Sequence, residues 1–304
     1  MSTTPTLIVT FVRHGESMDN LLNVWAGWKD APLSNHEHNQ ARAAGESLAS
    51  TRFSAIYASD LKRAYSTAEA IYEKQTDPKP TFTSSSLLRE QHFGIAEGHP
   101  WSWTMTPGLS LEDHFAQGLY PVMDGRTDAF PEGESLNDVA ARAEQVIQDF
   151  VLSNLRQAAQ EGRKGVHIAL VSHGICISEL IPALMTKDES RKHPGHKYRG
   201  LLNTAWTRIT VNVKGSEPGK PIELNDGTLP ALEVVLTDFN RSEHLEAVKR
   251  QRGGIGSSAY DPKQKDIRAY FSGGAVEKTE EGRSESNAED EVDVNFKEDK
   301  ASSL

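Results

Sequence analysis

The chain has 304 residues, a formal net charge of −10 and 37% hydrophobic residues, which is enough chain for one large domain or two small ones. Ten acidic and four basic side chains fall within residues 277–300, so the rest carries only about −4 and is not a general nucleic-acid binder by charge. The single cysteine, Cys176, excludes an intrachain disulfide and a cysteine-based zinc or iron–sulfur site.

Apolar runs and helical spacing alternate along residues 7–239. The expected elements, in order, are a strand at 7–12, a helix at 35–50, a strand at 53–59, a helix at 61–72, an edge strand at 81–83, a helix at 135–160, a strand at 166–172, a helix at 175–185, and strands at 204–213 and 232–236. This order predicts an α/β fold in three layers, with a mostly parallel central sheet and helices on both faces.

Polar residues mark where two of these helices begin. Ser34, with Glu37 three residues later, predicts a capping box at the start of the first helix. Asp60 is the expected N-cap of the second helix.

Residues 94–133 show no regular period and interrupt the alternation. They contain several Gly and Pro and six large apolar side chains, Trp101, Trp103, Met105, Phe115, Tyr120 and Phe130. A long irregular segment within a compact domain is typical of a lid or wall over a functional site. We therefore expect this insert to cover the substrate; the alternative is that its apolar residues only pack the loop.

The composition changes after Phe239. Residues 240–304 are polar and glycine-punctuated, then acidic and serine-rich, so they cannot bury enough surface to offset chain entropy. We predict a folded domain at 1–239 and a largely disordered tail at 240–304.

The sequence features that bear on location favour a soluble protein. No run approaches the ~20 apolar residues of a membrane span, and the first five residues lack the basic start of a signal peptide. A lone cysteine fits a reducing compartment. We expect a cytoplasmic protein, with the nucleus as a further location.

Two buried strands, far apart in the sequence, each end in His-Gly. The first is followed by Arg13, His14 and Gly15, and the other by His173 and Gly174. The carboxyl ends of parallel strands form the ligand-binding edge of an open α/β sheet, so we expect the two histidines to meet there.

Two further residues fit a phosphate site at that edge. Arg63 lies at the start of a helix that follows a strand, and both arginine forks and helix N-termini suit phosphate. Glu90 opens the aromatic insert, and a buried carboxylate beside a phosphate would be kept protonated and suited to general acid work.

These residues carry a resemblance that covers residues 7–239. Arg-His-Gly-Glu-Ser at 13–17 resembles the phosphohistidine signature of the histidine phosphatase superfamily, the phosphoglycerate mutase-like proteins. The motifs that extend the resemblance are Asn20, Trp25–Ser34, Ser59–Ala68, Leu88–Gly98, Gly133–Arg142, Ser172–Gly174 and Asn203–Ala205. The resemblance implies the phosphoglycerate mutase-like fold and is nearest to the fructose-2,6-bisphosphatase, TIGAR-like and fungal-type phosphatase branch.

The resemblance also implies a role for each matched residue. His14 takes the phosphoryl group on a ring nitrogen, with a backbone carbonyl fixing its tautomer, and Glu90 protonates the leaving oxygen. The groups expected to hold the phosphate are Arg13, Asn20, Gly27, Arg63, His173 and the N–H of Gly174. It implies no metal and no cofactor, because arginine and histidine supply the positive charge.

The choice between phosphatase and mutase depends on the walls of the site. The insert at 94–133 has one basic residue, Arg126, unlike the basic substrate segment of cofactor-dependent phosphoglycerate mutases. We therefore expect a phosphatase, a phosphoric monoester hydrolase acting on a small substrate such as a sugar phosphate. A phosphoglycerate mutase-type phosphotransferase is the first alternative.

The tail provides a second alternative, a scaffold protein. Residues 264–271 resemble the PIP-box peptide that docks on the sliding clamp of DNA replication, with the four key positions at Gln264, Ile267, Tyr270 and Phe271. Their spacing would place the apolar residues on one face of a helical turn. Short motifs of this kind often occur by chance, and the other reading is a segment that folds back on the domain.

Overall fold

The computed structural model describes residues 4–102, 105–123, 125–190, 198–224, 228–251 and 255–258. All of them belong to one compact unit, Met1–Tyr260. The PIP-box-like segment at 264–271 and Trp103 lie outside the described residues.

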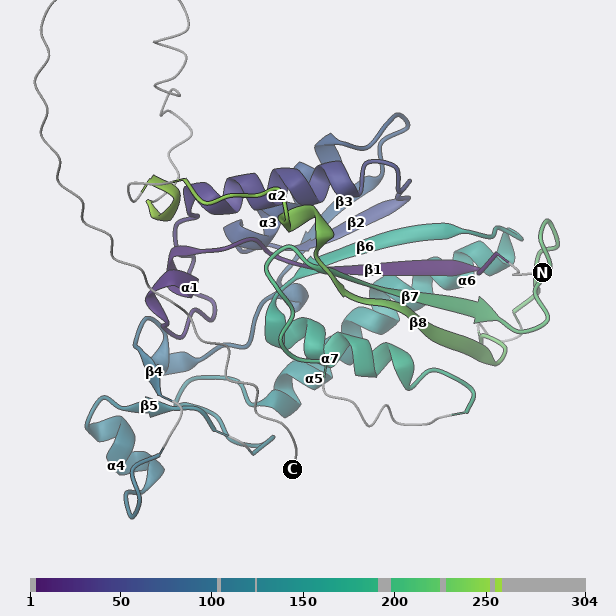
Figure 1. Cartoon of the computed structure of the whole chain (residues 1–304). Coiled ribbons are helices and arrows are strands. Elements are labelled where there is room, and N and C mark those ends of the chain that lie inside the picture. The colour runs from purple at the N-terminus through teal and green to yellow at the C-terminus, as the bar shows by residue number, and fades with distance from the viewer. Residues whose placement is uncertain are drawn as a thin grey trace, which may run out of the picture. The chain divides into compact units, whose positions relative to one another are not determined.

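A six-stranded mixed sheet forms the centre of this unit, in the order β3-β2-β6-β1-β7-β8 (Figure 1). The strands are β1 (Leu7–Arg13), β2 (Ala55–Ser59), β3 (Thr81–Ser85), β6 (Val166–Ser172), β7 (Trp206–Val213) and β8 (Leu232–Arg241). The pairs from β3 to β1 are parallel, while β7 is antiparallel to both of its neighbours. The predicted mostly parallel sheet is confirmed, with β3 at one edge as expected.

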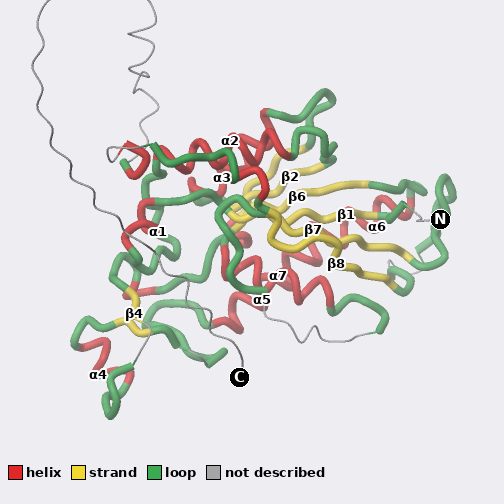
Figure 2. Tube along the Cα trace, viewed as in Figure 1, coloured by secondary structure: helices red, strands yellow, loops and turns green. Residues whose placement is uncertain are grey.

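Helices cover both faces of the sheet, which confirms the three-layer α/β prediction. The main helices are α2 (Asn35–Ser47), α3 (Lys62–Glu73), α5 (Leu136–Val146), α6 (Ser153–Gln160) and α7 (Gly174–Met185). Figures 1 and 2 show α2 and α3 along one face and α5 and α7 along the other. A separate core lies on each face of the sheet. Ile71 of α3 packs in one core, and Leu155 of α6 and Leu180 of α7 pack in the other.

The register of β1 and β6 brings their carboxyl ends together. Arg13 pairs with Ser172, so His14 and His173 leave the sheet side by side. On the other side of β6, Ala58 of β2 pairs with Val171, which brings the start of α3 to the same edge. Sequence-distant polar residues therefore meet where ligands bind in this class of fold.

The insert at 94–133 has a small core of its own. It contains a 3₁₀ turn (Gly94–Ala96), β4 (Trp101–Ser102), α4 (Leu111–Ala116) and β5 (Tyr120–Pro121), and β4 pairs with β5. Tyr120 and Phe130 are buried in a cluster with Phe93, against which Trp25 and Phe115 pack. The aromatic residues thus pack the insert against the loop that follows β1, while Met105 stays exposed.

The structure corrects the expected helix ends. Ser34 does cap α2 by accepting the N–H of Glu37 at 3.0 Å, but the Glu37 carboxylate turns to Ser66 and Thr67 instead of closing the capping box. Asp60 is not an N-cap, because its carboxylate pairs with Arg89 and Leu61 occupies the cap position.

Two further elements differ from the prediction. A short helix, α1 (Met18–Leu22), follows the first strand, in a segment for which no helix or strand was predicted. The predicted long helix at 135–160 is interrupted by a π-helical stretch, Ile147–Leu152, between α5 and α6.

The described structure continues past residue 239, where the sequence placed the domain boundary. β8 runs to Arg241, and residues 242–251 and 255–258 contact α2 and the loop after β1 through hydrogen bonds and an ion pair. Polar contacts rather than apolar burial hold this segment, which is why its composition did not reveal it. Within the ranges given above, no helix is both long and apolar enough to cross a membrane.

Candidate active site

The two predicted histidines lie against each other at the sheet edge. The rings of His14 and His173 have their centres 4.9 Å apart, and both side chains are buried. The backbone N–H of His14 donates to Ser172 O at 2.9 Å, so the strand pairing itself sets this spacing.

A backbone carbonyl fixes the tautomer of His14. Nδ1 lies 2.5 Å from Gly15 O, and because a carbonyl only accepts hydrogen bonds, Nδ1 must carry the proton. Burial and the nearby charges of Arg63 and Arg13 hold the pKa of His14 well below its ordinary value. The ring is therefore neutral near pH 7, with an unprotonated Nε2.

Arg63 is a fully buried cation held by the loop after β1. Nη2 donates to Gly27 O at 2.6 Å and Nη1 donates to Lys29 O at 3.1 Å. Gly27 has a φ of +49°, and a Cβ there would lie 1.9 Å from a Glu97 oxygen, so only glycine fits this close approach. The predicted residue Gly27 thus contacts Arg63 through its carbonyl oxygen.

Arg63 also sets the state of His173. Its Nε donates to His173 Nδ1 at 3.2 Å, so Nε2 carries the proton and donates to Ser59 Oγ at 2.9 Å. The pKa of His173 is lowered well below its ordinary value, first by burial and then by Arg63. A phosphate contact from His173 therefore requires that Arg63 or Ser59 exchange its hydrogen bond.

Arg13 supplies a second guanidinium. Nη1 donates to Leu201 O, whereas Nε is buried without a hydrogen-bond partner. A Cβ on Gly174 would lie 3.7 Å from this Nε and 3.8 Å from Glu90 Oε2, so Gly174 lines the space between them. An unsatisfied buried donor is costly unless an acceptor arrives, and an anion would supply one.

Glu90 occupies the N-terminus of α7. Its carboxylate accepts the backbone N–H groups of Ile175 at 3.1 and 3.2 Å, Cys176 at 3.1 Å and Gln91 at 3.0 Å. The positive end of the helix dipole adds to these bonds. The acidic residue expected at the site is thus fixed beside Arg13 and Gly174.

Asn20 stands apart from this group. The amide oxygen of Asn20 accepts two hydrogen bonds from Ser17, one from the backbone N–H at 3.0 Å and one from the hydroxyl at 3.1 Å. These bonds cap α1. Within the described part of the chain, no hydrogen bond joins Asn20 to the other predicted site residues.

Two residues for which no site role was predicted, Arg142 and Trp28, hold the backbone of Glu90. Arg142 donates to the carbonyls of Leu87, Arg89 and Glu90 and pairs with Glu134. Trp28 donates its ring N–H to Glu90 O at 2.7 Å. The signal in the sequence was that both residues lie within motifs that extend the family resemblance, Trp25–Ser34 and Gly133–Arg142.

The predicted site therefore gathers two arginines, two neutral histidines and one carboxylate, a set that suits a phosphate. Over the described ranges, no group of three or more His, Cys, Asp and Glu side chains could hold a metal ion.

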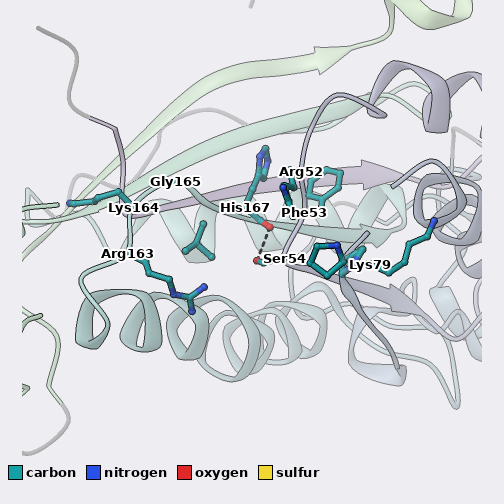
Figure 3. Close-up of a pocket in the computed structure, with 11 residues that line it drawn as sticks. Arg52, Phe53, Ser54, Lys79, Arg163, Lys164, Gly165 and His167 are labelled. Atoms are coloured by element: carbon teal, nitrogen blue, oxygen red, sulfur yellow. Dashed lines mark hydrogen bonds between the residues drawn. The ribbon is translucent and has the colours of Figure 1, made fainter. Parts of the chain in front are cut away.

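A concavity lies at the opposite, amino end of the strands (Figure 3). Its volume is about 400 Å³, and its walls come from the chain just before β2, β3 and β6, including Arg52, Lys79 and Arg163. Lys79 donates to the carbonyls that end α3, and Figure 3 shows Ser54 hydrogen-bonded to the His167 carbonyl. This hollow contains none of the predicted site residues.

Comparison with known proteins agrees with this geometry. The family model of the histidine phosphatase superfamily (branch 1) matches residues 9–217. The zebrafish fructose-2,6-bisphosphatase TIGAR B is 28% identical over 268 residues, which cover 80% of this chain and 98% of that protein. A Schizosaccharomyces pombe protein named a probable phosphatase is 26% identical, over 86% of this chain and 78% of its own length.

Mutases and solved phosphatases also match. A phosphoglycerate mutase of S. pombe is 31% identical over 183 residues, 58% of this chain and 78% of the mutase. The native structure of mycobacterial glucosyl-3-phosphoglycerate phosphatase matches with a TM-score of 0.55 and 26% identity, over 77% of this chain and 99% of that one.

The expected resemblance and the predicted enzyme class, a phosphoric monoester hydrolase, are confirmed at the level of the family. A family model that spans most of the folded unit, together with the meeting of two His-Gly strand ends, identifies the chain as a member of the histidine phosphatase superfamily (branch 1).

Proposed function

We propose that this protein hydrolyses a phosphomonoester of a small metabolite through a phosphohistidine on His14. The observation that carries the proposal is the tautomer of His14. Nδ1 is bound to Gly15 O, so the lone pair of Nε2 is available in a buried site flanked by Arg13 and Arg63.

The first step is phosphoryl transfer from the substrate to the enzyme. His14 Nε2 attacks phosphorus, an N–P bond forms, and the bond to the substrate oxygen breaks. Arg13 and Arg63 stabilise the charge on the phosphoryl oxygens. In the proposed step Glu90 acts in its acid form and gives its proton to the leaving oxygen, so the product leaves as a neutral alcohol.

The second step returns the enzyme to its starting state. Glu90, now ionised, takes a proton from a water molecule that attacks the phosphohistidine. The N–P bond breaks, inorganic phosphate forms, and Glu90 is protonated again. The Nδ1–H···O=C bond to Gly15 keeps His14 in one tautomer through both steps.

The insert favours hydrolysis over transfer to a second phosphorylated substrate. Its only basic residue, Arg126, is bound to Glu179 at 3.0 and 2.7 Å and so is not a ready second phosphate ligand. The alignment with a TIGAR-type bisphosphatase also covers more of this chain than the alignment with a mutase. A sugar phosphate or phosphoglycerate ester is the substrate class that these relatives suggest.

The test uses the full chain, a panel of sugar phosphates, bisphosphates and phosphopeptides, and 4-nitrophenyl phosphate as a generic probe. We expect phosphate release by the wild type and by His38→Ala, an exposed histidine on α2, and none by His14→Ala. Quenching a reaction with ³²P-labelled substrate in alkaline detergent should trap an alkali-stable, acid-labile phosphoenzyme only when His14 is present. Transfer to an added phosphoglycerate acceptor without phosphate release would instead identify a mutase.

A further inference from the structure

The chain after the last strand returns to the loop that carries the nucleophile. We define this strap as residues 242–251 and 255–258, which follow β8 and lie along α2. The family model ends at residue 217, so the strap lies beyond the matched region. Its contacts reach three segments that frame His14.

The first contact is with Thr204, a residue that is hydrogen-bonded to the backbone of the nucleophile. His244 Nε2 lies 3.0 Å from Thr204 Oγ1, and the N–H of Thr204 donates to His14 O at 3.2 Å. Thr204 has a φ of +56°, a left-handed conformation that a threonine rarely adopts without support from its surroundings. The strap therefore helps to hold the residue that fixes the carbonyl of His14.

The second contact is an ion pair with Glu16, two residues after the nucleophile. Arg250 Nη2 lies 2.5 Å from Glu16 Oε2, while Glu16 Oε1 accepts the hydroxyl of Ser34 at 3.0 Å. The Glu16 side chain is only 13% exposed, so its pair with Arg250 is better shielded than a surface pair. The backbone N–H of Glu16 donates to Gln40.

The third contact anchors the end of the strap. The carbonyl of Ser258 accepts the N–H of Asn35, the first residue of α2, at 3.0 Å. Arg250 Nη1 donates to Ser257 Oγ at 3.1 Å, which joins this end to the ion pair. Both ends of the strap are thus bonded to the domain, with Glu16 between them.

We propose that Arg250 is a positioning residue, which through Glu16 holds the Gly15–Ser17 backbone so that Gly15 O stays aligned on His14 Nδ1. This inference rests on the proposed function, because alignment of that carbonyl matters only if His14 is the nucleophile. Loss of the pair lets Glu16 and the adjacent Gly15 peptide move, which lowers the fraction of enzyme with a correctly oriented Nε2.

Three single substitutions in the full chain test the proposal, with 4-nitrophenyl phosphate as the probe. Arg250→Gln removes the charge and should lower kcat/KM about fivefold, and Arg250→Glu, which repels Glu16, should lower it further. Lys249→Glu changes the charge of an exposed neighbouring residue by the same amount as Arg250→Glu does, and it should leave kcat/KM unchanged. Hydrogen exchange at Gly15–Ser17 should speed up in both Arg250 variants only.

The double variant Glu16→Arg/Arg250→Glu restores opposite charges and should recover part of the loss, which a general loss of folding would not do. Wild-type kcat/KM and exchange in Arg250→Glu would overturn the proposal. If His14→Ala keeps activity, the proposed phosphohistidine mechanism fails instead, so the two outcomes are distinguishable.

Discussion

Glu37 provides a stability test that depends on one buried carboxyl. It lies in the first turn of α2 with almost no exposed surface, and Oε1 accepts hydrogen bonds from Ser66 Oγ at 3.1 Å and Thr67 Oγ1 at 3.4 Å. Burial raises its pKa from 4.5 to about 7, and the two hydroxyls offset only part of that. The change to make is Glu37→Gln, which keeps the shape of the neutral acid.

The raised pKa of Glu37 decides whether its contribution to stability rises or falls with pH. Between pH 4.5 and 7 the folded protein binds the Glu37 proton more tightly than the unfolded chain, so the Glu37 contribution to stability falls as pH rises through that window. A shift of that size corresponds to about 3 kcal/mol at most. Glu37→Gln should therefore gain stability relative to wild type as pH rises, by up to about 3 kcal/mol above pH 7.

Urea unfolding at a series of pH values from 5 to 8.5 measures this difference. The comparison between variant and wild type removes the opposite contribution of the buried histidines, whose lowered pKa values favour folding as pH rises. Glu46→Gln, on the exposed side of α2, is the control for the same substitution at a glutamate outside the core. A difference for Glu37→Gln that stays constant from pH 5 to 8.5 would refute the reasoning.

Two further predictions concern the same part of the molecule. Gly15→Ala would place a Cβ 2.6 Å from Glu37 Cγ, so we expect a loss of about 1–3 kcal/mol in urea unfolding, and wild-type stability would contradict the close packing behind His14. Arg142→Leu removes the donors that hold the Glu90 carbonyl and leaves Glu134 unpaired, so kcat/KM should fall at least about tenfold, with stability lowered by about 3 kcal/mol. Unchanged kcat/KM in Arg142→Leu would show that Trp28 and the backbone N–H groups around the carboxylate hold Glu90 without Arg142.

The sequence predicted the meeting of the two histidines because that meeting follows from local pattern and a general rule of α/β sheets. Two continuous apolar runs ended in His-Gly, and parallel neighbours bring such ends together. The tautomer of His14 was also predictable, because its partner is the carbonyl of the very next residue.

The two errors at helix starts share one physical cause. Asp60 and Glu37 both satisfy local capping rules, but each side chain binds a partner distant in the sequence: Arg89 for Asp60, and the Ser66 and Thr67 hydroxyls for Glu37. A cap contributes about 1 kcal/mol, which the charged Arg89 can outweigh for Asp60.

The site also shows why its two histidines are neutral. The guanidinium of Arg63 is fully buried, that of Arg13 is partly buried, and the charge of Glu90 acts on both. Neutral carbonyl oxygens accept hydrogen bonds from both arginines and fix their positions. Burial first, and then the positive charges of Arg63 and Arg13, lower the pKa of His14 and of His173, which keeps His14 nucleophilic. A phosphate dianion is a partner that would balance those positive charges. One arrangement therefore favours both an unprotonated nucleophile and binding of the group it is proposed to attack.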